Sequence, residues 1–136
     1  MRLYATPEYL AQNGTPLTMA DFASHRLICQ HPGTAQVAAG ASLVQDLMAN
    51  DIPSTLTVNN YFGVLQGVLN HIGIGVLPDY ITEDFPHLIR VLPDVESGEV
   101  PVFLAYPEEL RHSKRVAAFR EFVSEEIFKY RKREQG

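Results

Sequence analysis

The stretch Thr55 to Ile81, TLTVNNYFGVLQGVLNHIGIGVLPDYI, predicts a strand, a helix and a second strand in succession. Apolar residues recur in it at the spacing of one helix face: Tyr61, Val64, Leu65, Val68, Leu69 and Ile72. Asn59 and Asn60 can cap the first turn, and Gly73 can supply the left-handed residue that ends the helix. Such a unit directs the free N–H groups of its helix toward the carboxyl edge of a sheet. Open α/β sheets bind small ligands at that edge.

Size, composition and charge place the chain among ordinary globular proteins. Its 136 residues, 46% of them hydrophobic and 20% charged, are enough for one domain with a sizeable core. The formal net charge of −5 argues against a nucleic-acid groove, because phosphate binding requires clustered positive charge. Cys29 is the only cysteine, so no internal disulfide can form. No segment resembles a signal peptide or is long enough to span a bilayer, so we expect a cytoplasmic protein.

Other segments predict strands and helices on both sides of the central unit. Thr6 followed by Pro7 is typical of a helix start, and Thr18 with Asp21 can form a capping box. Strands are expected at 3–5, 26–30 and 88–91, with a turn at 31–33, and helices at 6–13, 18–23, 38–50 and 79–82.

The C-terminal third predicts one more strand and the longest helix. Leu92 to Glu99 is rich in turn residues and is expected to be a loop. Val100 to Tyr106 is apolar throughout, so we expect a strand buried on both faces of a mixed sheet. Ser113 can cap a helix that runs to about Arg131, and one face of this helix is apolar: Val116, Phe119, Val123, Ile127 and Tyr130.

The sequence contains no assembled catalytic or metal-binding motif. Gly73-Ile74-Gly75 lacks the third glycine of a dinucleotide fingerprint, because Pro78 stands at that position. Cys29 and His31 have no second pair of ligands with which to hold zinc. We therefore expect no catalytic residue, no metal site, no cofactor and no enzyme activity.

Six stretches of the chain match one protein family in the same order. They are LYATPEYLAQNGTP, DFASHRLI, LTVNN, GIGVLPDYI, LIRVLPD and VFLAYPEELRHSKRVAAFREFV. This series resembles the effector-binding domain of LysR-type transcriptional regulators from Leu3 to about Glu126, least over Gln30 to Ile52. The resemblance implies an α/β fold, one lobe of a type II periplasmic-binding-protein-like fold. Its sheet would be mixed, mostly parallel and five-stranded, with helices on both faces and a long C-terminal helix.

The resemblance also implies how the chain is organised. A single domain would cover residues 1–136, with 3–99 as the second lobe and 100–131 as the returning strand and C-terminal helix of the first lobe. Neither the helix-turn-helix of such regulators nor most of the first lobe has a counterpart, so we interpret the chain as a C-terminal portion. We expect no DNA binding by the chain itself and no membrane partner. We expect a homo-oligomer, because the final helix would lose much of the lobe that it normally covers.

In this family the effector lies between the lobes, held by polar groups at helix N-termini and strand ends. The corresponding positions here are Gln30 at a strand end and Asn59, Asn60 and Tyr61 at the start of the central helix. The asparagines are equally suited to capping, and Tyr61 suits the core. The resemblance implies sensing of a small molecule, which we expect to carry a carboxylate. The alternatives are a stand-alone metabolite-binding protein, a dimerisation module and a small enzyme. The sequence contains no motif that supports the last of these.

Overall fold

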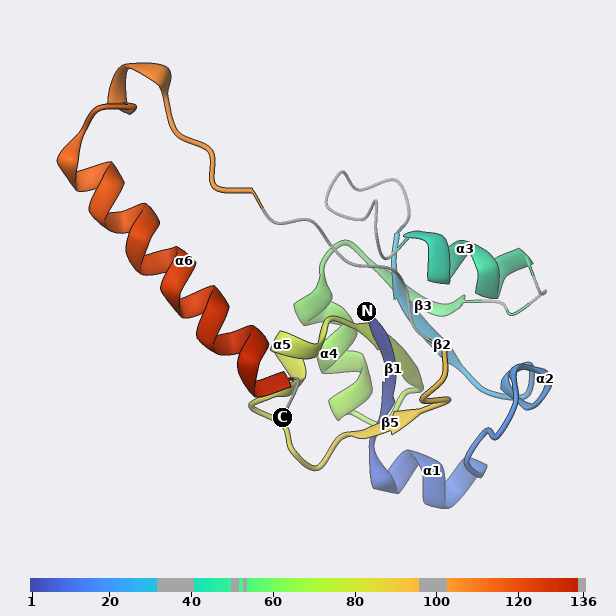
Figure 1. Cartoon of the computed structure of the whole chain (residues 1–136). Helices are drawn as coiled ribbons and strands as arrows, with labels where there is room; N and C mark the ends of the chain where they lie inside the picture. The colour runs from blue at the N-terminus through green and yellow to red at the C-terminus, as the bar shows by residue number, and fades with distance from the viewer. Residues whose placement is uncertain (32–40, 50–51, 53, 96–102, 135–136) are drawn as a thin grey trace. The chain divides into compact units, whose positions relative to one another are not determined.

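The computed structural model describes residues 1–31, 41–49, 52, 54–95 and 103–134 (Figure 1). The chain divides into two compact units, Met1–Pro101 (unit 1) and Val102–Gly136 (unit 2). The predicted turn after His31, the first residues of the helix expected at 38–50 and the end of the loop at 92–99 lie outside the described residues. Whether the two units belong to different lobes stays a prediction.

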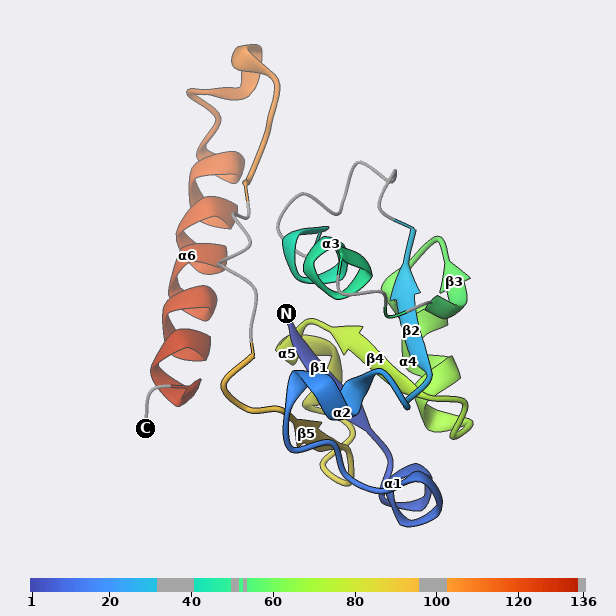
Figure 2. The same ribbon diagram turned by 90° about the vertical axis from the view of Figure 1, so that its right-hand side faces the viewer.

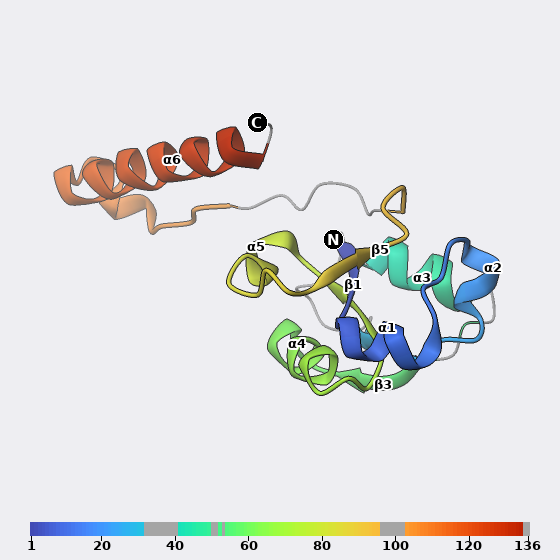
Figure 3. The same ribbon diagram turned by 90° about the horizontal axis from the view of Figure 1, so that it is seen from below.

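Unit 1 is a mixed five-stranded sheet with helices on both faces, as the family resemblance implies (Figures 2 and 3). Its elements are β1 (Arg2–Ala5), α1 (Pro7–Asn13), α2 (Met19–Phe22), β2 (Leu27–Gln30), α3 (Ala41–Ala49), β3 (Ser54–Val58), α4 (Tyr61–Leu69), β4 (Ile74–Leu77), α5 (Asp79–Thr82) and β5 (Ile89–Val91). The strand order is β3-β2-β4-β1-β5. Strands β2, β3 and β4 are parallel, and β1 is antiparallel to both of its neighbours. Their pairing is regular except between β2 and β3, where Leu27 lies opposite Ser54 but Ile28 opposite Leu56.

Each face of the sheet has its own apolar core. Helices α1, α2 and α3 cover one face with Tyr9, Leu10, Phe22, Leu43, Val44 and Leu47. Helices α4 and α5 cover the other face with Val64, Leu65, Val68 and Ile81. Tyr61, Leu69 and Ile72 pack against this second core and are partly buried. The apolar stripe predicted for the central helix therefore does face the sheet.

The polar residues that were expected to begin helices do so in unit 1. The Thr6 hydroxyl accepts from the Tyr9 N–H at 3.4 Å, and α1 begins at Pro7. Thr18 and Asp21 form the predicted capping box of α2. These contacts satisfy N–H groups that have no acceptor within the helix, which explains why the chain turns into helices at these residues.

Gly73 does not end the central helix, and this prediction was wrong. Helix α4 ends at Leu69, and the residue with a left-handed backbone is His71, at φ 58°. Gly73 lies against the neighbouring chain instead, where a Cβ atom would stand 2.3 Å from the Arg26 carbonyl oxygen. His71 is held in its conformation by its ring, because Nδ1 lies 2.7 Å from the Thr6 hydroxyl. The glycine is needed for close packing rather than for a left-handed turn.

Unit 2 contains a 3-10 turn, η2 (Glu108–Leu110), and the long helix α6 (Lys114–Glu134). The helix begins directly after Ser113, as predicted, and extends a little beyond Arg131. The strand expected at 100–106 is not found over its described part, 103–106, where Phe103 is 84% exposed. A strand requires a neighbour with which to exchange main-chain hydrogen bonds, and no described strand pairs with this segment. No described helix is long and apolar enough to cross a membrane.

A buried histidine predicts how the stability of unit 1 depends on pH. The His25 ring packs against Tyr9 and Phe22, and its Nδ1 lies 3.3 Å from the Tyr9 hydroxyl. Burial lowers the pKa of His25 below its usual 6.5, and the nearby Asp21 carboxylate opposes this shift. The unfolded chain therefore binds a proton more readily than the folded chain does as the pH falls through about 6.5. We expect the free energy of unfolding to decrease below this pH.

Urea denaturation between about pH 8 and pH 5 measures this effect. In the variant His25→Gln, the decrease in stability toward acid pH should be smaller than in the wild-type chain. Equal decreases in the two proteins would show that another group is responsible.

Candidate functional site

The carboxyl ends of the parallel strands β2, β3 and β4 lie at one edge of the sheet, which we call the ligand edge. Gln30 is the last residue of β2, and Asn59 directly follows β3. The Gln30 side chain is 2% exposed, and its Nε2 donates to the Asn59 carbonyl at 2.9 Å. The His31 N–H donates to the Val58 carbonyl at 2.8 Å and extends the pairing of the two strands. These bonds bring Gln30 and Asn59 together.

Asn60 is the cap of α4. Its backbone is extended, with φ −152°, and its Oδ1 accepts from the Gly63 N–H at 2.8 Å. Its Nδ2 donates to the Asn59 Oδ1 at 2.7 Å, so the two exposed asparagines have different roles. Of the two residues that were predicted as caps, Asn60 caps the helix, and Asn59 accepts a hydrogen bond from the Asn60 side chain.

The first turn of α4 presents two N–H groups at the ligand edge. An α-helix leaves its first N–H groups without an intrahelical acceptor. Asn60 satisfies the N–H of Gly63 with its side chain and that of Val64 with its carbonyl. Among the described residues, no acceptor is found for the N–H groups of Tyr61 and Phe62. Together with the helix dipole, these groups favour an anionic or carbonyl oxygen at this position.

Tyr61 belongs partly to the core and partly to the ligand edge. Its ring packs against the core of α4 and α5. Burial raises the pKa of the Tyr61 hydroxyl, and the neighbouring Tyr80 raises it further. The structure thus places all four predicted residues at one corner of the sheet, which we call the amide corner: Gln30, Asn59, Asn60 and Tyr61.

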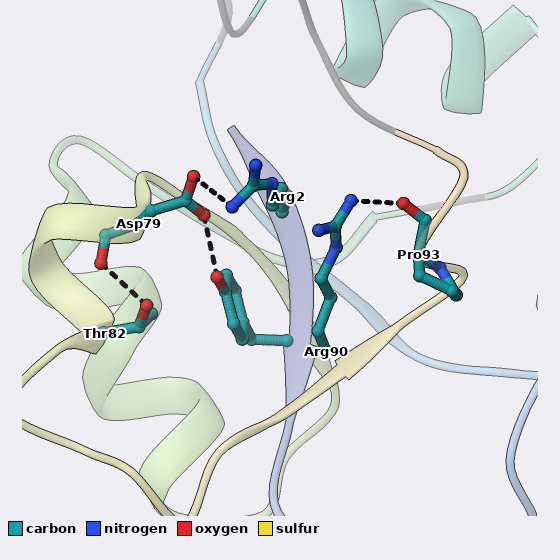
Figure 4. A network of polar contacts seen from close by, with 6 residues as sticks. Arg2, Asp79, Thr82, Arg90 and Pro93 are labelled. Carbon is teal, nitrogen blue, oxygen red and sulfur yellow. Dashed lines mark hydrogen bonds and ion pairs between the residues drawn. The ribbon is translucent and has the colours of Figure 1, made fainter. Parts of the chain in front are cut away.

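A polar network that the sequence analysis missed lies at the same edge (Figure 4). The Arg2 guanidinium lies 2.7 Å from one carboxylate oxygen of Asp79, and the Tyr4 hydroxyl donates to the other at 2.7 Å. The Thr82 hydroxyl donates to the Asp79 carbonyl at 2.8 Å. Burial raises the pKa of Tyr4. Arg2 is the first residue of β1, and Asp79 follows β4. A prediction that these two strands pair antiparallel would have placed Arg2 and Asp79 close together.

The described residues offer binding groups rather than reactive ones. No group of three or more histidine, cysteine, aspartate or glutamate residues is placed to hold a metal ion in the described part of the chain. Cys29 is fully buried, and its thiol contacts the Ser54 hydroxyl at 3.3 Å. The arrangement at the ligand edge can donate and accept hydrogen bonds, and this suits the recognition of a small polar molecule.

The cap assignment predicts different costs for the two asparagines. Asn60→Ala removes the acceptor of the Gly63 N–H and should lower the free energy of unfolding by about 0.5–2 kcal/mol. Asn59→Ala removes only a contact on the exposed surface and should change it by less than about 0.5 kcal/mol. Urea denaturation of both variants tests the assignment, and a larger loss in Asn59→Ala than in Asn60→Ala would reverse it.

Comparison with known proteins identifies the family. A sequence profile of the LysR substrate binding domain matches residues 1–127. The chain belongs to the LysR substrate binding domain family. An uncharacterized HTH-type transcriptional regulator from Haemophilus influenzae is 28% identical over 111 residues, which are 79% of this chain and 38% of that protein. The family resemblance inferred from the sequence is confirmed.

Solved structures of the LysR type share the fold. The regulatory domain of CrgA, a LysR-type transcriptional regulator from Neisseria meningitidis, has a TM-score of 0.67 and 22% identity, and the match covers 92% of this chain and 63% of that one. CrgA itself gives a TM-score of 0.68 and 24% identity over 93% and 44% of the two chains. The full-length structure of AphB, a virulence activator of Vibrio cholerae, gives a TM-score of 0.53 and 18% identity, and the match covers 71% of this chain and 34% of that one. The chain therefore spans only part of the length of these relatives.

Proposed function

We propose that this LysR substrate-binding-domain chain is the effector-sensing part of a bacterial transcriptional regulator, and that a carboxylate-bearing small molecule binds at the amide corner. The observation that carries this proposal is the pair of N–H groups of Tyr61 and Phe62 beside the buried amide of Gln30. A helix N-terminus favours negative charge by about 0.3–1 kcal/mol, and by more when partly buried.

The family membership supports sensing rather than catalysis. The relatives are described as transcriptional regulators, and the described residues of the ligand edge present hydrogen-bonding groups without a nucleophile. In our proposal the chain has no enzyme activity and does not contact DNA, which a helix-turn-helix in a separate part of the regulator would bind. A regulator of transcription acts where the DNA is, so we place the protein in the cytoplasm.

The experiment that tests the site removes one N–H group and leaves the helix intact. Proline suits the first helical position, and Asn60 before it already has the extended backbone that proline requires. Tyr61→Pro deletes both the N–H group and the ring, whereas the matched control Tyr61→Ala deletes the ring alone. We expect acetate to shift the amide resonances of residues 61–63 in the wild-type chain and in Tyr61→Ala. In Tyr61→Pro, residue 61 has no amide proton, and we expect acetate to leave the resonances of residues 62 and 63 unchanged. Sodium chloride at equal ionic strength should give no such shifts. Equal responses of the two variants to acetate would contradict the proposed site.

Exposed apolar side chains in unit 2 favour self-association, which we propose as a second property of the chain. Phe103, Phe119, Phe122 and Phe128 are all more than half exposed. Leu104, Ala105 and Tyr106 line a mostly apolar pocket with Arg115, Val116 and Phe119 of α6. Surfaces of this kind usually mark protein contacts.

Sedimentation velocity over a range of protein concentrations tests this prediction. We expect the wild-type chain to form homo-oligomers and Phe122→Ser with Phe128→Ser to shift the distribution toward monomer. A wild-type chain that stays monomeric at the highest concentration would contradict it.

A further inference from the structure

Helix α6 carries a row of four exposed side chains whose spacing reads the same from both ends. They are Arg115, Phe119, Phe122 and Glu126, which stand four, three and four residues apart. Residues at this spacing lie within roughly 60° of one another around an α-helix. Phe119 is 55% exposed and Phe122 60%. We call these four residues the RFFE row: a basic residue begins it, two phenylalanines form its middle and an acidic residue ends it.

The RFFE row is complementary to a second copy of itself in one orientation. Alternating steps of four and three residues are those of the contact positions in a coiled coil. If two copies of α6 lie antiparallel about the middle of the row, Arg115 lies opposite Glu126 of the second copy. Phe119 then lies opposite Phe122 of the second copy. Each contact occurs twice, as two-fold symmetry requires.

The charges of the row select the antiparallel orientation. A parallel pair would place Arg115 beside Arg115 and Glu126 beside Glu126, and like charges in such positions repel each other. In the antiparallel pair every charge of the row meets the opposite charge. The Lys129 ammonium already lies 2.6 Å from Oε1 of Glu126. A carboxylate can accept several hydrogen bonds, so Glu126 can also receive the guanidinium of a second copy.

A pocket at one end of the row suits the ring that this pairing brings to it. The pocket has a volume of about 250 Å³ and is lined by Leu104, Ala105, Tyr106, Arg115, Val116 and Phe119. The antiparallel pair brings Phe122 of the second copy to Phe119, at the wall of this pocket. An apolar cavity of about 150 Å³ is large enough for benzene, so a phenylalanine ring fits.

We propose that two copies of the chain associate through an antiparallel pair of α6 helices. Phe122 of each copy occupies the pocket of the other, and Arg115 of each copy pairs with Glu126 of the other. This inference rests on the proposed self-association of unit 2 and adds its surface, orientation and register. The partner is a second copy rather than another protein, because the row is complementary to itself.

Charge exchange in the whole chain, followed by sedimentation velocity, tests the pairing. Arg115→Glu and Glu126→Arg each place like charges opposite each other twice and should raise the dissociation constant of the dimer at least about tenfold. The double variant restores both ion pairs and should return this constant to within about threefold of the wild-type value. An equimolar mixture of the two single variants should form a mixed dimer, because each variant supplies the charges that the other requires. Circular dichroism should show unchanged helix content in every variant.

Two phenylalanines of α6 test the pocket. Phe122→Ala should raise the dissociation constant of the dimer at least about tenfold, because two buried rings are lost. Phe128→Ala is the matched control: this ring is 64% exposed, but it lies about 150° away from the row around the helix. We expect this control to leave the dissociation constant unchanged. Equal effects of the two variants would contradict the proposed position of Phe122.

The outcomes separate this inference from the proposed self-association. If the wild-type chain stays monomeric at the highest concentration, both are wrong. If it associates but the single charge variants associate equally well, self-association stands and the antiparallel pair is wrong. If the single variants associate weakly and neither the double variant nor the mixture restores the dimer, Arg115 and Glu126 do not face each other, and the antiparallel pair is again wrong.

Discussion

Gly73→Ala should lower the free energy of unfolding by about 3 kcal/mol or more, the upper range for forcing an atom into a packed interior. The added Cβ would stand 2.3 Å from the Arg26 carbonyl oxygen, which is too close for any rotation of a side chain to relieve. The same carbonyl accepts from the Ile74 N–H at 2.8 Å, so moving it also breaks a bond that joins β2 to β4. Urea denaturation followed by circular dichroism measures the loss.

Gly63→Ala is the matched control, because this glycine also packs closely but against a side chain. Its added Cβ would stand 3.1 Å from the Cβ and Cγ2 atoms of the partly buried Val58. Alanine also favours helix by about 1 kcal/mol over glycine, which offsets the crowding. We expect a net change below about 1 kcal/mol. Similar losses in the two variants would show that the Arg26 carbonyl is not the reason for Gly73.

Leu47→Ala should cost about 2–5 kcal/mol, because it opens a cavity under α3. Leu47 is fully buried and belongs to the core that α1, α2 and α3 form on one face of the sheet. This variant also tests the helix where the sequence resembles its family least. Thermal and urea denaturation measure the loss.

Gln45→Ala on the same helix is the control for Leu47. Its side chain is exposed, so the free energy of unfolding should change by less than about 0.5 kcal/mol. If Leu47→Ala costs as little as this control does, α3 does not pack on the sheet as described.

The sequence predicts the elements of unit 1 well because their causes are local. The apolar stripe of α4 and the caps Thr6, Thr18 and Asn60 each depend on residues within a few positions of one another. Gly73 was misread because its requirement comes from the Arg26 carbonyl on another strand, and no local pattern reports that contact. The apolar segment before α6 was misread for a similar reason. Whether such a segment forms a strand depends on which strand it meets.

The candidate site likewise combines features that follow from the local sequence with features that depend on contacts between distant strands. The nearness of Gln30 and Asn59 to the start of α4 could be expected, because strand ends and helix starts converge at one edge of a parallel sheet. That these residues and Tyr61 bind a ligand is what the family resemblance implies, and it stays a prediction. The link between Arg2 and Asp79 could not be expected, because it depends on the antiparallel pairing of β1 with β4.

The irregular pairing of β3 has a consequence for how the chain avoids fibrous aggregation. β3 lies at one edge of the described sheet, and its residues, STLTV, carry no charge that would repel an incoming strand. The register shift beside Leu27 places an extra residue in β3, and the Ser54 hydroxyl turns back to the Leu56 carbonyl and the Thr57 hydroxyl. A strand bent in this way is a poor template for a second chain, because ladder growth requires a regular row of main-chain donors and acceptors. Local irregularity thus protects an edge that its composition leaves undefended, and the self-association that we propose would use the side chains of unit 2 rather than the backbone of this strand.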